Sequence, residues 1–290
     1  MSNNLKPATT FIQQVQILSS RNISITDSKA CEDFLSKVNY YRLSGYLLPF
    51  KRTPSDINCI SPVSFETIVD IYKFDAELRN ILSYAIEKIE IYMRTQLAYF
   101  HGIHYGPDGY MDIKNFNSKH DHIRFITHIH KCIKDNSKSP VVIHHNNVYA
   151  GNFPIWVIID FFTCGMLSYF YTDLKNPDKT YLSMSIYNVN YQTLSSWMRC
   201  LTDLRNRCAH YSRLYYWNFL AVPRMPKGNK FIANNQLFSQ IYMLKLMYPD
   251  KDKWDNDVYK PLVKLFNKYK NSINKEHIGF PYRWKSMLKN

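Results

Sequence analysis

The feature that most restricts the fold is a run of apolar residues at helical spacing between Asp75 and Phe100. The apolar positions are Leu78, Ile81, Leu82, Ala85, Ile89, Tyr92, Met93 and the Gln96–Leu97 pair. Recurrence three and four positions apart is typical of an amphipathic helix with one buried face. We therefore predict a long helix over about 75–100.

The opposite face of this predicted helix is polar, and two interpretations of it stay open. Its residues are Asn80, Ser83, Glu87, Glu90, Arg94 and, about two turns further, His101. Such a stripe is most simply a solvated face. Alternatively, Glu87 or Glu90 orients a functional side chain, and Glu90 with Arg94 forms an i,i+4 ion pair.

Caps and periodicity predict further helices along the chain. We expect them over 11–18, 28–38 (capped by Asp27 or Ser28), 120–134, 155–171, 235–247 and 253–270, with one more starting at Ser64. The strongly apolar 155–171 run is too short to span a bilayer comfortably, so it is expected to be the central core helix. The segment 176–179 is predicted to end it. Asn190 is expected to cap another helix, followed by a short one ending at Pro223 and Pro226.

These elements predict a mostly α fold. The boundaries expected are an N-terminal helical segment over 1–62, a helical core over 63–222 with an insert near 102–152, and a C-terminal segment over 223–290. One continuous domain is the alternative. A chain of 290 residues with 46% hydrophobic residues can bury a sizeable core, which excludes general disorder.

The net charge of +14 favours a polyanionic partner, RNA or an anionic membrane surface, unless the charge is scattered and serves only solubility. Between Arg199 and Lys230 there are seven cations and one carboxylate, Asp203, which favours a polyanionic partner.

The six cysteines form no C-x-x-C pair and no signal peptide opens the chain, so reduced thiols in the cytoplasm are expected. The histidines over 120–145 match no zinc spacing, and we interpret that segment as solvated and variable, with no metal or cofactor.

The residues most suggestive of chemistry are Arg205-Asn206-Arg207-Cys208-Ala209-His210. A guanidinium, an amide and an imidazole are the groups needed to hold a phosphate and move a proton on a ribose hydroxyl. Asn206 and His210 share a helix face, whereas Arg205 lies about 140° from His210. Arg205 must therefore reach around the helix, or the helix must distort near His210. An ordinary helix end with favourable cations is the alternative.

Side chains around this run could bind RNA, and the candidates are Arg199, Arg207, Tyr211, Arg213, Lys227 and Lys230. Bases stack on exposed tyrosine rings, although aromatic rings more often pack the core. Cys208 is expected to be a small buried hydrophobe rather than a nucleophile.

The Arg-Asn-x-x-x-His run resembles the signature of HEPN ribonucleases. Further blocks resemble, in order, the bacterial Abi (abortive infection) family of the AbiD/AbiF type: 40–46 with Pro49-Phe50, 74–79 with 86–94, Phe153-Pro-Ile-Trp156, and 279–281 with Trp284. The resemblance implies a HEPN-type helical bundle with additional helices, a role in phage defence, action on RNA, and catalytic roles for Arg205, Asn206 and His210. It also implies a homodimer in which two such motifs face each other. Arg94 and His101 satisfy a looser spacing that HEPN proteins allow, as a second, degenerate site.

The function expected is a metal-independent endoribonuclease that uses the ribose 2′-OH. The alternatives are a non-catalytic RNA-binding protein, such as a regulator with a regulatory RNA or antitoxin-like partner, and a protein scaffold that senses phage. A membrane partner is not expected.

Overall fold

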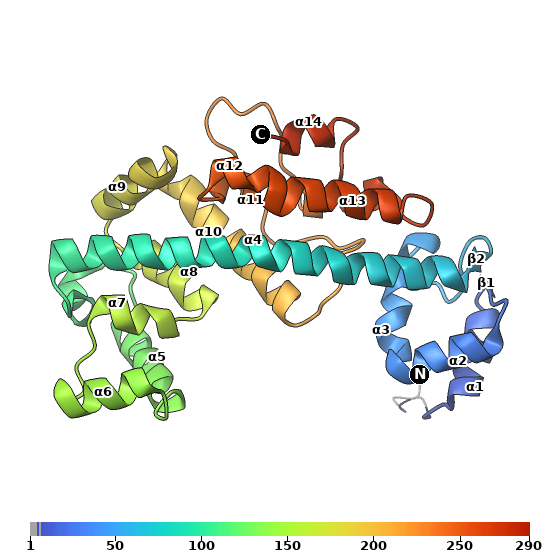
Figure 1. The fold of residues 1–290 in the computed structure, drawn as a ribbon, viewed down its shortest axis with the longest axis horizontal. Helices are drawn as coiled ribbons and strands as arrows, with labels where there is room; N and C mark the ends of the chain where they lie inside the picture. Colours follow the sequence, from blue (N-terminus) through green and yellow to red (C-terminus); the bar gives the residue numbers. More distant parts are fainter. Residues whose placement is uncertain (1–4, 6) are drawn as a thin grey trace.

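A single long helix, α4 (Phe65–Tyr105), runs through the molecule from end to end (Figure 1). The computed structural model describes residues 5 and 7–290. At 41 residues α4 is about 60 Å long. Its side-chain cap is Ser64, which accepts a hydrogen bond from the Thr67 N–H at 3.1 Å. The mostly α prediction is confirmed, and the helix predicted over 75–100 exists but is longer at both ends.

The N-terminal elements gather at one end of α4 (Figure 1). They are α1 (Phe11–Ser19), β1 (Ile23–Ser24), α2 (Ser28–Lys37), α3 (Tyr40–Ser44), a 3₁₀ turn (Gly45–Phe50) and β2 (Val63–Ser64). β1 and β2 pair in parallel, with Ile23 opposite Val63. Asp27 caps α2, as predicted, by accepting from the Ala30 N–H at 2.9 Å.

The other end of α4 carries α5 (His122–Asp135), α6 (Pro140–Val148), α7 (Ile155–Ile158), α8 (Cys164–Asp173) and α9 (Asn176–Tyr187). The single helix predicted over 155–171 is wrong. Phe162 is extended, at φ −68° and ψ 133°, and Thr163 caps a new helix, α8. The segment 176–179 is likewise the first turn of α9, with proline at the helix start, rather than a break. The central helix is α4 instead.

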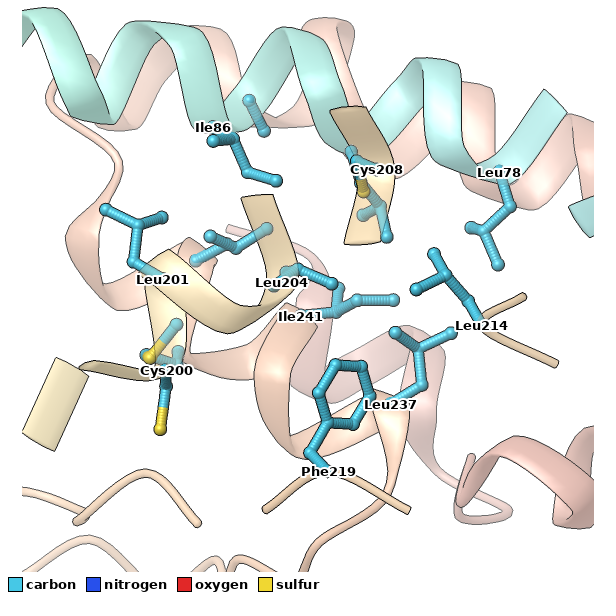
Figure 2. Close-up of a cluster of buried hydrophobic side chains, with 14 of the residues drawn as sticks. Leu78, Ile86, Cys200, Leu201, Leu204, Cys208, Leu214, Phe219, Leu237 and Ile241 are labelled. Carbon is cyan, nitrogen blue, oxygen red and sulfur yellow. The ribbon is translucent and has the colours of Figure 1, made fainter. Parts of the chain in front are cut away.

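Helix α10 (Tyr191–Ala209) packs against α4 and α8, and Asn190 caps it as predicted. Its predicted apolar face is buried, at Leu194, Trp197, Met198, Leu201 and Leu204. Figure 2 shows part of the shared core, in which Ile86 of α4 lies by Leu201 and Leu204 of α10, and Leu78 of α4 lies on the side of Cys208 and Leu214. Burial of each leucine stabilises the fold by about 1.5–3 kcal/mol, so this face holds α10, which carries the Arg-Asn-x-x-x-His run, firmly on α4.

Residues 210–236 contain no helix, so the short helix predicted to end at Pro223 and Pro226 is wrong. Side-chain contacts hold this segment instead. The Trp197 indole donates to the Arg224 carbonyl at 2.7 Å, and the Gln240 amide donates to the Ala221 carbonyl at 3.0 Å. The extended path therefore depends on bonds to neighbouring helices.

The C-terminal elements are α11 (Leu237–Met247), α12 (Lys251–Trp254), a π turn (Asp255–Tyr259), α13 (Lys260–Lys268), a 3₁₀ turn (Lys275–Ile278) and α14 (Trp284–Leu288). Both helices predicted here, over 235–247 and 253–270, are present. Leu237 and Ile241 of α11 join the core of α4 and α10 (Figure 2). N-terminal, central and C-terminal segments thus all contribute to one buried cluster.

The polar stripe of α4 is only partly solvated. Asn80, Ser83 and Glu87 are exposed, as a solvated face requires. Glu90 and His101 are buried, at 7% and 0% exposed, so the solvated interpretation is wrong for these two. Buried polar groups need partners, and those of Glu90 lead to the candidate site.

Candidate functional site at the end of helix α10

The Arg-Asn-x-x-x-His run forms the last turn of α10 and its cap. The backbone N–H of His210 still donates to the Asn206 carbonyl at 2.9 Å, but its φ of −92° and ψ of 12° are no longer helical. Tyr211 then turns the chain at a positive φ of 55°. Asn206 and His210 are both exposed at this helix end, while Cys208 points into the core.

Arg205 faces α4, where its partner is Glu90. The Arg205 Nε lies 3.5 Å from one Glu90 carboxylate oxygen, and the Arg94 guanidinium lies 2.6 Å from the other. Arg94 also donates to the Phe162 carbonyl at 2.7 Å. Glu90 therefore bridges two guanidinium groups, one from each helix. The predicted orienting role fits Glu90.

A solvent-open pocket of about 350 Å³ lies over this bridge. Its charged lining residues are Glu87, Glu90, Arg94 and Arg205, and Cys208 and Ala209 form the α10 wall. Arg205 is 38% exposed at the side chain, whereas Arg94 is 17% exposed. Arg205 is thus the more accessible cation for a phosphate. A bound phosphate would compete with the Glu90 carboxylate for the Arg205 guanidinium. His210 lies beyond the pocket wall, at the end of the helix.

The chain that follows His210 is clamped by residues far away in the sequence. The Tyr211 carbonyl accepts a hydrogen bond from Arg42, and the Ser212 carbonyl accepts one from Arg79 at 3.4 Å. The Leu214 N–H donates to the Asp75 carboxylate at 3.2 Å.

Asp75 is fully buried and joins three segments. It accepts hydrogen bonds from the Tyr46 hydroxyl at 2.7 Å, from Arg79 at 2.5 Å and from the Tyr215 N–H at 2.8 Å. Sequence reasoning missed this network, although its residues lie in two of the blocks that carry the family resemblance and beside the motif. Asp75 and Arg79 four positions apart were the available signal, because such pairs share a helix face. The network positions the end of α10.

Two of the candidate RNA-binding cations are engaged within the chain. The Arg207 guanidinium lies 3.7 Å from the centre of the Trp217 ring, and its Nε lies 3.4 Å from Asp203. Burial lowers the pKa of Arg207 from its usual value. Arg213 donates to the backbone carbonyls of residues 215 and 216, at the turn after the motif. Both guanidinium groups support the fold around the site.

The other candidate residues remain accessible to a partner. Arg199 on α10 and Lys227 and Lys230 in the 210–236 segment are exposed, and Tyr211 is 69% exposed. The predicted basic surface thus retains exposed cations on one helix and on the segment that follows it.

The cysteines behave as the sequence predicts. All six are free thiols in the structure. Cys208 is 5% exposed and lies in the core, as predicted for a small buried hydrophobe, and burial raises its pKa to about 12.

His101 does not join Arg94 in a second site. It is fully buried, and its ring lies 5.2 Å from Phe170 and 5.8 Å from Phe116, between ring centres. Burial lowers the pKa of His101 to about 4, so the ring is neutral at physiological pH. It is a core residue of α4, and its spacing from Arg94 has no catalytic consequence.

The histidine-rich segment is more buried than predicted. His120 is buried and pairs with Asp173 at 2.9 Å, and its other ring nitrogen lies 3.2 Å from His122. His145 is also buried and bonds the Asn152 carbonyl at 2.9 Å. The interpretation of 120–145 as a solvated segment is therefore wrong at these positions. Across residues 5 and 7–290 no group of three or more histidine, cysteine or acidic side chains is arranged to hold a metal ion.

Fold and site together define a mostly α-helical protein in which a basic helix end lies over a carboxylate of the central helix. Residues 33–216, more than half of the chain, match the model of the Abi-like protein family, and the chain belongs to that family. This confirms the resemblance to a bacterial Abi family and associates the chain with abortive infection, a form of antiviral defence. The matched residues contain both the Arg205–Glu90 pair and the Asp75 network.

No curated protein and no solved structure gave a significant match to the chain. In the part of the chain that the structure describes, none of the helices combines the length and the apolarity that crossing a membrane requires.

Proposed function

We propose that this Abi-like protein is a cytoplasmic, HEPN-type endoribonuclease that acts in abortive infection and needs no metal ion. The observation that carries the proposal is the placement of the motif. Arg205 is held by Glu90 at the edge of an open pocket, and Asn206 and His210 are exposed on the same helix end. A cation, an amide and an imidazole are thereby gathered at one helix end, with Arg205 lining the pocket and His210 just outside it.

In this mechanism the imidazole of His210 from one copy accepts the proton of a ribose 2′-OH. The 2′ oxygen then attacks the adjacent phosphorus, and the bond from phosphorus to the 5′ oxygen breaks. Arg205 stabilises the charge that develops on the phosphoryl oxygens. The leaving 5′ oxygen takes a proton from a second imidazolium, which a homodimer supplies as His210 of the other copy. The products are a 2′,3′-cyclic phosphate end and a free 5′-hydroxyl end.

The test is cleavage of single-stranded RNA by the purified protein in EDTA, with the end groups identified by mass. His210→Ala is expected to lower the rate by about 10²–10⁴-fold, the usual contribution of general acid–base catalysis. His130→Ala removes another exposed imidazole, on α5, and is expected to cleave at the wild-type rate. Equal rates for wild type and His210→Ala would overturn the catalytic assignment.

A second candidate function is RNA binding without cleavage. It is favoured by one observation: within a single chain Arg205 lines the pocket, whereas His210 lies outside it. If RNA binds and no product forms in any of these reactions, the protein is an RNA-binding regulator that works with a regulatory RNA or an antitoxin-like partner.

A further inference from the structure

A second pocket, of about 630 Å³, adjoins the site along α4. Arg94 lines both pockets, so the two share one wall. Besides Arg94, the second pocket is lined by Tyr99 and Ile103 of α4 and by Trp156 of α7. Tyr99 is five residues beyond Arg94, which is about 7.5 Å along the helix.

Two accessible aromatic rings line this pocket. Tyr99 is 71% exposed and Trp156 is 55% exposed. The Trp156 ring lies against α4 at Gly102, where a Cβ atom would come within 3.4 Å of it. Its neighbour Ile155 is fully buried and donates its N–H to the Pro107 carbonyl at 2.7 Å. The ring is therefore supported on one side by a rigid helix, while much of its surface stays open to solvent.

The chemistry of the pocket favours a nucleic-acid base over a phosphate. Its walls are mostly aromatic and aliphatic, and Asp160, which is exposed there, repels a phosphodiester. Single-stranded RNA is bound by stacking its unpaired bases on aromatic rings while cations hold the backbone. Arg94 and Arg205 lie on the side of the pocket where that backbone would pass.

We infer that this pocket is a base-binding subsite for single-stranded RNA, in which a base further along the strand whose phosphate lies at Arg205 stacks on Trp156 and Tyr99. The inference rests on the proposed function for its choice of RNA as ligand, but it concerns binding alone. It assigns to Trp156, which lies 49 positions before Arg205 in the sequence, a direct contact with substrate.

The experiment measures the affinity of a fluorescently labelled single-stranded RNA by anisotropy, in EDTA and in the His210→Ala background so that no cleavage intervenes. Tyr99→Ala and Trp156→Leu are each expected to weaken binding about tenfold, within the range of base–aromatic stacking. Tyr99→Phe keeps the ring and is expected to bind normally. Tyr169→Ala is the matched control, because Tyr169 is 70% exposed on α8 and lines a different pocket. Melting temperatures confirm that each variant is folded.

The outcomes separate the two proposals. Loss of affinity in both aromatic variants with normal binding by Tyr169→Ala supports the subsite, even if the wild-type protein never cleaves RNA. Salt-sensitive RNA binding that neither substitution weakens overturns the subsite and leaves the proposed function standing. Variants that lose self-association but bind RNA normally identify the rings as a protein interface and also overturn it. Absence of any RNA binding overturns both.

Discussion

Asp75 of α4 accepts a hydrogen bond at 2.8 Å from the backbone N–H of Tyr215, which lies 140 positions later in the chain. The bond ties the segment just after His210 to the central helix. Burial raises the pKa of the Asp75 carboxyl, while Arg79, Tyr46 and two backbone N–H groups oppose this rise by stabilising the charge. The end of the motif helix is thus held by a buried charge with several partners.

Asp75→Asn is expected to lower the free energy of unfolding by about 3–5 kcal/mol, because Arg79 loses its buried counter-charge. Asp33→Asn is the matched control, since Lys29 and Asp33 are also four positions apart on a helix but are exposed. Exposed pairs contribute about 0–1 kcal/mol. Urea unfolding measures both variants. Equal losses in the two would show that the Asp75 network does not hold the fold.

Glu90→Gln keeps the shape of the side chain and removes the charge between Arg94 and Arg205. We expect a loss of stability of about 2 kcal/mol, as for a hydrogen bond to a charged group. We also expect tighter RNA binding, because a phosphate no longer competes with the carboxylate for Arg205. Glu87→Gln, on the exposed surface of the same helix, should change stability by less than about 0.5 kcal/mol. Weaker RNA binding by Glu90→Gln would refute the competition.

His101 is expected to make stability depend on pH between about 4 and 6.5, its folded pKa and its ordinary value. Over this range the unfolded chain binds a proton that the buried ring does not, so stability is complete above pH 6.5 and falls as the pH falls. The full loss is about 3 kcal/mol. His101→Phe suits the surrounding aromatic rings and should remove this part of the pH dependence. Unfolding at pH 7.5 and pH 5 measures it, and the same slope in both proteins would contradict the prediction.

RNA binding is expected to weaken steeply with salt. Each phosphate contact to a single strand contributes about −0.7 to the slope of log affinity against log salt concentration. Replacing both Lys227 and Lys230 by alanine should therefore reduce the slope by about 1.4. Replacing Lys29 and Lys37, which are exposed on α2, serves as control and should leave it unchanged. A wild-type affinity that does not respond to salt would exclude binding through phosphates.

A homodimer is expected, with Arg205 and His210 near its two-fold axis, so that the solution mass is about twice the chain mass of 34.5 kDa. Arg205→Ala and His210→Ala should each be inactive. Mixed together, they should stay well below the wild-type rate, because the proposed site needs His210 of both copies and a mixed dimer carries only one. Light scattering and the mixing assay test this. A fully active monomer would rule out a shared site.

Local patterns were sufficient where the deciding interaction is local. The caps Ser64 and Asn190 were identified, and Asp27 was one of two candidates, because a capping side chain bonds a backbone N–H two or three positions away. The break at Phe162 was not identified, because the apolar residues on both sides of it were interpreted as one buried helix and the cap formed by Thr163, which accepts from the Met166 N–H at 3.2 Å, was overlooked.

By itself the sequence determined that the chain is mostly helical, that α4 and α10 each bury one face, and that a basic run with Asn206 and His210 ends the second of these helices. Only the tertiary structure decided which polar residues are buried and what they bind. Glu90 could have been solvated, and it is buried because Arg205 reaches it from another helix. Asp75 and Arg79 meet partners more than 130 positions away. A charged side chain is buried only where partners such as these satisfy it. Helical periodicity carries no information about residues so distant in the chain.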